Sequence, residues 1–195
     1  MGTVATLVVP QMNVSADEFD ELADEVSYLL ETVENSISAT IENSYVCKFN
    51  QAYAGEEVPI DKITYDVLFS AMETYELTEH YYNPAVYYSV KAFGFPLPVG
   101  SSPTSLPDTQ EVEAFRELAS YFGEVELMEK GGKYYAIKPD FTVNVSGEEY
   151  SLAIDLGGIG KGWCADKVDE LMYESGYDYG YFNFGSSSMS LKNYA

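Results

Sequence analysis

The chain has 195 residues, and its 32 acidic and 10 basic side chains give it a formal net charge of −22. A surface this acidic repels phosphate groups and anionic lipid, which all but excludes a general role in binding nucleic acid. Arg116 is the only arginine and His80 the only histidine, so the chain offers neither a pair of histidines for zinc nor an arginine cluster for phosphate. Apolar residues make up 46%, which is typical of a globular protein.

The first half of the sequence predicts helices. Residues 6–10 form a short β-branched run that ends on proline and predict a strand. Ser15 and Glu18 then have the spacing of a capping box, and apolar residues recur every three or four positions from there to residue 37. The same periodicity predicts a second helix over residues 61–79. A third should begin at Pro107-Asp108, after a loop rich in serine and proline.

The second half changes to alternation. Gly131-Gly132 separates two short apolar runs and predicts a hairpin over residues 125–137. Strands are expected over residues 141–145 and 150–154, and then a helix that ends at Ser175-Gly176. Two more strands should follow, over residues 179–183 and 189–191. The predicted fold is α+β, with helices packed on an antiparallel or mixed sheet, in one domain over residues 1–195.

The two cysteines, Cys47 and Cys164, have no CxxC spacing. Two buried thiols are favoured, and a single disulfide is the alternative. No run of about 18 apolar residues occurs, so no membrane-spanning helix is expected.

The strongest local signal for function is the segment 155–162, DLGGIGKG, where four glycines and Lys161 follow Asp155. Glycines let a backbone approach a ligand closely, and a helix start offers free N–H groups to an anion. The spacing matches neither a Walker A loop nor the Rossmann fingerprint. Two interpretations stay open: a phosphate-binding turn between a strand and a helix, or a merely tight connection. Asp155 suits a helix cap, a hydrogen-bond acceptor for a ligand or a metal partner.

The same segment is similar to the central block of the ApbE family of flavin transferases, which reads roughly DLGGIAKGYAVD. Three upstream stretches agree with this resemblance and occur in the family's order. Residues 1–3 read MGT, residues 44–50 resemble S-x-x-x-R-x-N, and residues 82–95 resemble FDPTV followed by WGF.

The resemblance implies a T-fold-like α+β protein that binds FAD as a substrate. With Mg²⁺, such an enzyme transfers FMN to a threonine or serine hydroxyl of a target flavoprotein of the respiratory or electron-transfer type, and it releases AMP. Carried over by position, the cofactor-binding residues would be Met1, Tyr81, Tyr82, Asn83, Asp155 and Lys161. The carbonyl of Gly158 would be a metal ligand.

Some positions differ from the family pattern. Asn83 and Ala85 replace aspartate and threonine, and Ser187 replaces an acid. Thr40 stands where the family commonly has an aromatic that stacks on flavin, so stacking would come from Tyr81, Tyr82, Tyr87 or Tyr88. His80 lies in the wrong block to be the family's catalytic histidine. Family members continue well past the position of Ala195, so the catalytic residues are expected beyond it, and this chain should lack the C-terminal part of the fold and be inactive alone.

Two alternatives remain from other classes of function. One is an FAD- or nucleotide-binding domain without catalysis, and the other is a secreted acidic interaction domain in which the glycines are structural. The family also implies an extracytoplasmic protein whose native form is anchored by lipid. The sequence does not identify the target flavoprotein or the oligomeric state.

Overall fold

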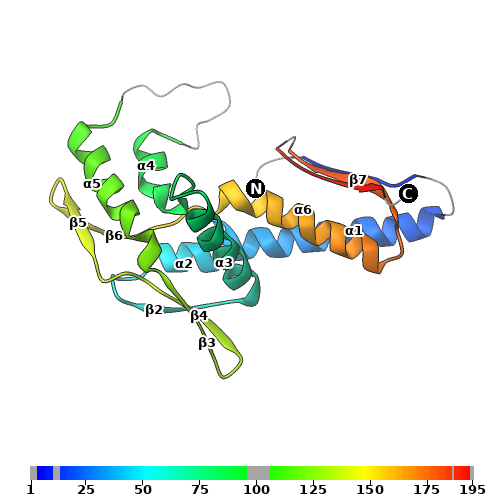
Figure 1. Cartoon of the computed structure of the whole chain (residues 1–195), viewed down its shortest axis with the longest axis horizontal. Helices are drawn as coiled ribbons and strands as arrows, with labels where there is room; N and C mark the ends of the chain where they lie inside the picture. Colours follow the sequence, from blue (N-terminus) through cyan, green and yellow to red (C-terminus); the bar gives the residue numbers. More distant parts are fainter. Residues whose placement is uncertain (1–3, 11–13, 96–105, 186, 194–195) are drawn as a thin grey trace. The chain divides into compact units, whose positions relative to one another are not determined.

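The computed structural model describes residues 4–10, 14–95, 106–185 and 187–193. The chain forms two compact units (Figure 1): residues 1–35 together with 157–195 make the first, and residues 36–156 make the second. Within the described residues, no helix has the length and apolar character needed to cross a membrane.

The first unit consists of two long helices and a three-stranded sheet. The helices are α1 (Ala16–Ile37), whose last residues enter the second unit, and α6 (Gly157–Glu174). The antiparallel sheet has the order β1 (Ala5–Val8), β7 (Tyr179–Phe184), β8 (Ser188–Asn193). Helix α6 packs against β7 and β8. Leu7 pairs with Phe182, so both residues lie on the face of the sheet on which Phe182 and Phe184 are buried.

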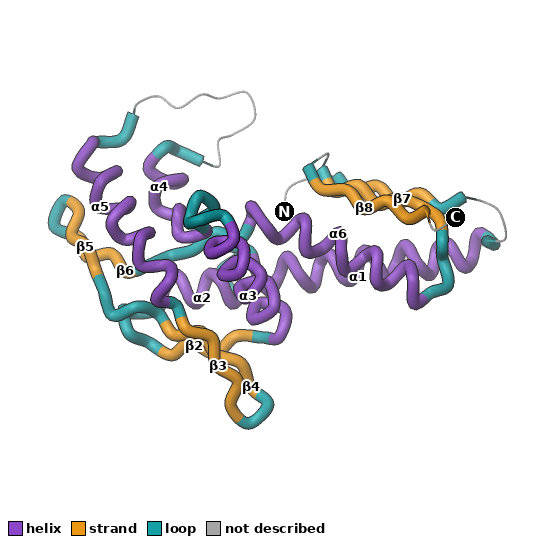
Figure 2. The backbone as a smooth tube through the Cα atoms, in the orientation of Figure 1, coloured by secondary structure: helices purple, strands orange, loops and turns teal. Residues whose placement is uncertain are grey.

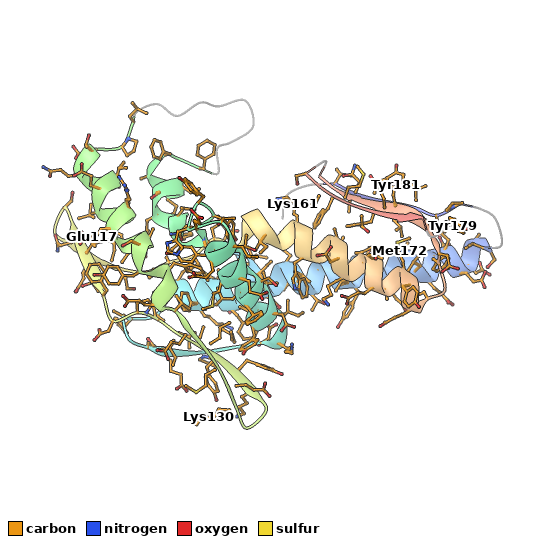
Figure 3. All side chains as sticks on the ribbon, viewed as in Figure 1. Glu117, Lys130, Lys161, Met172, Tyr179 and Tyr181 are labelled. Atoms are coloured by element: carbon orange, nitrogen blue, oxygen red, sulfur yellow. The ribbon has the colours of Figure 1, made fainter. Side chains whose placement is uncertain are left out.

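Gly180 lets strand β7 come close to its neighbours. A Cβ atom at this position would lie 2.6 Å from the carbonyl oxygen of Val8 and 2.8 Å from the terminal methyl of Met172. Its φ of +153° is also an angle that residues with a Cβ atom rarely adopt. The Met172 side chain extends from α6 toward β7 (Figure 3), so glycine is required where helix and sheet meet.

The second unit contains the remaining elements. Its helices are α2 (Tyr45–Gln51), α3 (Lys62–Leu77), α4 (Tyr87–Ala92) and α5 (Thr109–Ala119), with 3₁₀ turns η1 (Pro84–Val86) and η2 (Ser120–Glu124). One antiparallel sheet has the order β2 (Glu57–Ile60), β4 (Lys133–Ile137), β3 (Glu126–Lys130). These three strands lie together in Figure 2. A separate hairpin joins β5 (Thr142–Val145) to β6 (Glu148–Ser151).

The α+β class is confirmed, as are most of the predicted elements. The capping box forms as expected, since the backbone N–H of Ser15 donates to Glu18 Oε2 at 2.8 Å and the N–H of Glu18 donates to Ser15 Oγ at 3.2 Å. Asp61 and Asp108 cap α3 and α5 with their side chains. The predicted hairpin is β3–β4, and both glycines of its turn have positive φ.

Several boundaries were wrong. The strand predicted over residues 6–10 ends at Val8. The strand predicted over residues 150–154 ends at Ser151, and residues 152–155 belong to no strand. The predicted glycine-rich turn is instead the beginning of helix α6, which starts at Gly157. The apolar alternation in the sequence continues past Ser151 because Leu152 and Ile154 are buried in the core. The backbone of Ile154, however, pairs with the side chain of Asn50 rather than with a strand.

The short elements α2, β2, η1 and α4 were not predicted. Helix α2 has only seven residues and α4 only six, too few for a clear helical period. Strand β2 contains Pro59, which weakens a strand prediction and is tolerated here at the edge of the sheet.

Candidate functional site

The second unit contains a cavity of about 370 Å³ that takes in Asp155. Its wall combines carboxylates, one lysine, a thiol and two aromatic rings, a mixture suited to a ligand with both ring systems and polar groups. The lining residues come from the segment after α1, from α2, from the region of α4 and from the segment before α6: Ala39, Thr40, Glu42, Cys47, Gln51, Tyr87, Val90, Lys91, Phe95 and Asp155.

Asn50 fixes the segment that carries Asp155. The side-chain Nδ2 of Asn50 donates to the carbonyl oxygen of Ile154 at 2.9 Å, and the N–H of Ile154 donates to Asn50 Oδ1 at 2.8 Å. All of these groups are buried. Beside this amide clamp, the N–H of Asp155 donates to the carbonyl of Pro84 at 2.8 Å. The backbone that leads into Asp155 is therefore held by three specific hydrogen bonds.

Helix α2 carries Asn50 and is capped at both ends. Ser44 is the N-cap, and its Oγ accepts a hydrogen bond from the N–H of Cys47 at 2.9 Å. At the other end the ammonium group of Lys138 donates to the carbonyls of Phe49 at 3.0 Å and Ala52 at 2.8 Å. Ser44 and Asn50 are the first and last residues of the S-x-x-x-R-x-N-like stretch. That pattern therefore corresponds to the N-cap of α2 and to the residue that holds the Ile154 backbone.

Tyr82 places a phenol near Asp155. Burial, together with the nearby carboxylate of Asp155, raises the pKa of Tyr82 to about 12. The Tyr82 hydroxyl is buried and has no hydrogen-bond partner among the described residues. A buried hydroxyl without a partner is unfavourable by itself, which makes it a candidate donor to a ligand.

Tyr81 and Asn83, the neighbours of Tyr82, lie differently. Tyr81 is 92% exposed, in the turn that follows α3. The amide of Asn83 is used by the fold: Nδ2 donates to the carbonyl of Ala119 at 2.9 Å, and Oδ1 accepts from the N–H of Ala85 at 2.8 Å. Asn83 is thus the N-cap of η1. None of the residues 81–83 is among those that line the cavity.

Gly158 and Lys161 belong to the first unit, in the first two turns of α6. Lys161 Nζ lies 3.4 Å from the carbonyl oxygen of Gly157, and Lys161 is labelled near the start of α6 in Figure 3. Gly158 is exposed. Within the described ranges no group of three or more His, Cys, Asp or Glu side chains could hold a metal. Met1 lies outside the described residues.

The cavity contains residues that the sequence pattern did not single out. Lys91 Nζ lies 5.0 Å from the ring centroid of Tyr87 and 3.3 Å from its hydroxyl. Glu42 and Phe95 complete the same wall. The spacing of four residues between Tyr87 and Lys91 is the only signal that could have linked them. Tyr87, one of the tyrosines considered for flavin stacking, lines this cavity, and so does Thr40, which stands where the family commonly has the stacking aromatic.

Cys47 and Cys164 are both free thiols. Cys164 is fully buried, whereas Cys47 is half-buried and lines the cavity. Burial raises the pKa of Cys164 to about 12, which suppresses the thiolate that reacts with alkylating reagents.

Iodoacetamide at pH 8 should therefore modify Cys47 in the native protein and leave Cys164 intact. Peptide mapping by mass spectrometry checks this, with the protein unfolded in urea as the control in which both thiols react. Alkylation of Cys164 at a rate like that of Cys47 in the native protein would contradict the burial described above.

Comparison with known proteins gave one family and several related structures. The ApbE family model matches residues 1–192. The flavin transferase ApbE from Vibrio cholerae has 24% sequence identity and a TM-score of 0.75, and the match covers 100% of this chain and 57% of that chain. The ApbE protein from Thermotoga maritima has 23% identity and a TM-score of 0.72, with 94% of this chain and 54% of that chain covered. For the flavinyl transferase ApbE from Pseudomonas stutzeri in its apo form the identity is 16% and the TM-score 0.70, with 97% and 53% covered.

These structures have the same fold as this chain, which spans little more than half of their length. No curated protein matched the sequence.

Proposed function

The chain belongs to the ApbE family, and on that premise we propose that it is the FAD-binding part of an FAD:protein FMN transferase. FAD would be the substrate, and the acceptor would be a threonine or serine hydroxyl of a target flavoprotein. In the transfer the hydroxyl gives its proton to a base, its oxygen forms a bond to the FMN phosphorus, the bond from that phosphorus to the AMP oxygen breaks, and AMP leaves. Because the chain spans 57% of a related transferase, the catalytic groups are proposed to lie outside it.

The observation that carries the proposal is Asp155, which reaches a mixed aromatic and polar cavity from the glycine-rich family motif. A carboxylate accepts hydrogen bonds, and FAD offers N–H and ribityl O–H donors. Tyr87 and Phe95 supply ring faces for an aromatic ring system. Lys91 brings a positive charge to the same wall, where it would offset the repulsion between a dianionic diphosphate and a chain with a net charge of −22.

Mg²⁺ belongs to the proposal as the partner of the diphosphate. Magnesium commonly binds through one or two protein oxygens together with water and substrate phosphates, so the absence of an acidic cluster among the described residues is compatible with such a site. The exposed Gly158 could supply a carbonyl oxygen, and Lys161 could contact the phosphates. When bound, the ion would neutralise charge that develops on the phosphate oxygens.

The first alternative is an FAD-binding domain without transferase activity. It is favoured by Asn83, whose amide is used to cap η1, where the family commonly has an aspartate. A secreted acidic interaction domain is the second alternative. An extracytoplasmic location and a lipid anchor on the native protein are also proposals, and they depend on the family alone.

Addition of FAD separates these alternatives. The transferase and binding proposals both predict a rise in thermal midpoint with FAD and slower alkylation of Cys47, which lines the cavity. If FAD causes neither effect, the secreted acidic interaction domain is the alternative that remains. If the native protein that contains this chain binds FAD, but with Mg²⁺ and an acceptor flavoprotein releases no AMP, the binding-only alternative holds.

A further inference from the structure

Lys138 is buried where a lysine is least expected. Its residue exposure is 1%, and it follows strand β4. Its Nζ donates to three backbone carbonyls: Phe49 at 3.0 Å, Asn50 at 3.3 Å and Ala52 at 2.8 Å. Burial lowers the pKa of Lys138 to about 8, and the charge of Glu56 opposes this shift. Burial of a charged amine is unfavourable, so the buried position of Lys138 needs an explanation. Its three directed hydrogen bonds point to one.

The three carbonyls belong to the end of helix α2 (Tyr45–Gln51) and the residue after it. The last carbonyls of a helix have no partner within the helix, and a cation there also interacts favourably with the helix dipole. One ammonium group thus fixes the orientation of the last turn of α2. Asn50 lies in this turn and clamps Ile154 with its side chain.

A second connection leads from Lys138 to the same segment. The carbonyl of Ala52 accepts from Lys138 and also from Ser151 Oγ at 3.2 Å. Ser151 is the last residue of β6, directly before the segment 152–155. Lys138 therefore supports this segment at its start through Ala52 and near its end through Asn50.

We propose that Lys138 is a positioning residue for the candidate site, acting through the end of α2 and the Asn50 clamp to hold Asp155 at the cavity. The role in flavin binding depends on the function proposed above, whereas the effect on the backbone does not. Lys138 itself is not among the residues that line the Asp155 cavity.

The test is amide hydrogen exchange of the Lys138→Met variant, followed residue by residue by NMR. Methionine keeps an apolar stem but donates no hydrogen bond. In this variant the amide of Ile154, which donates to Asn50, should exchange faster than in the unmodified protein. The factor of acceleration should be about ten times the factor at Leu68, a buried residue of α3, because local opening adds to global unfolding. Lys133→Met, an exposed substitution in β4, is the matched control and should change neither amide.

If Ile154 and Leu68 accelerate by the same factor, Lys138 affects only global stability and the proposal is wrong; an unchanged Ile154 also overturns it. Should Lys138→Met fail to fold, Lys138→Gln takes its place: its side chain is one atom shorter and has only two N–H donors, so it cannot serve all three carbonyls and Ile154 should again accelerate more than Leu68. FAD affinity is the second readout, and Lys138→Met should weaken it about fivefold more than Lys133→Met does. If the unmodified protein binds no FAD, the proposed function fails, while the exchange result still decides the role of Lys138.

Discussion

Replacement of Asn50 by alanine should lower the free energy of unfolding by about 2–5 kcal/mol, since two buried backbone groups lose their partners. These groups are the N–H and the carbonyl of Ile154, which Asn50 binds at 2.8 and 2.9 Å. No other residue is seen to bind them in the described part of the chain. Urea denaturation followed by circular dichroism measures the effect, and the midpoint should fall.

Gln51→Ala is the matched control, because Gln51 is the next residue of the same helix, is exposed and makes only a weak contact at 3.4 Å with the Cys47 sulfur. Its cost should stay within about 0.5 kcal/mol. Asn50→Asp keeps the acceptor for the Ile154 N–H but loses the donor to the carbonyl, so it tests the two bonds separately. An Asn50→Ala variant as stable as Gln51→Ala would show that the clamp contributes nothing to folding.

Replacement of Asp155 by asparagine should weaken FAD binding about 10- to 100-fold, the range expected for loss of one hydrogen bond to a charged group. Asparagine has the same shape, and the N–H of residue 155 can still donate to the Pro84 carbonyl. The thermal midpoint of the free protein should therefore change far less than the affinity. Isothermal titration calorimetry with FAD gives the affinity, and a thermal melt gives the stability.

Asp140→Asn is the control for charge, because Asp140 is an exposed carboxylate of the same unit and lines a different cavity. Both variants raise the net charge by one unit, so a general reduction of repulsion should affect them equally. If Asp155→Asn binds FAD as the unmodified protein does, Asp155 is not a ligand contact.

Local rules were enough to predict the long elements of this chain. Helix α1 has a capping box and a regular apolar stripe, and α3 and α5 each begin at an aspartate that caps the helix. The β3–β4 hairpin has two glycines at positive φ, the conformation for which glycine is best suited. In each case the signal lies within a few residues of the structure it specifies.

The connections that build the site could not be predicted in this way, because they join residues far apart in the sequence. Asn50 binds Ile154 across 104 positions and Lys138 reaches Phe49 across 89. A lysine after a strand usually remains in solvent, and nothing in the local sequence indicates that this one is buried. The resemblance to a family selected Asp155, while only the fold shows that Asn50 holds its backbone.

The most direct test of the central claim, that FAD binds at the cavity around Asp155, is an FAD titration followed by ¹H–¹⁵N NMR of the chain. Saturable shifts are predicted for amides of the lining residues Cys47, Tyr87, Lys91 and Asp155. The amides of Gly131 and Gly132, at the exposed tip of the β3–β4 hairpin, should not move. Absence of saturable shifts, or shifts confined to residues outside the cavity, would contradict the claim.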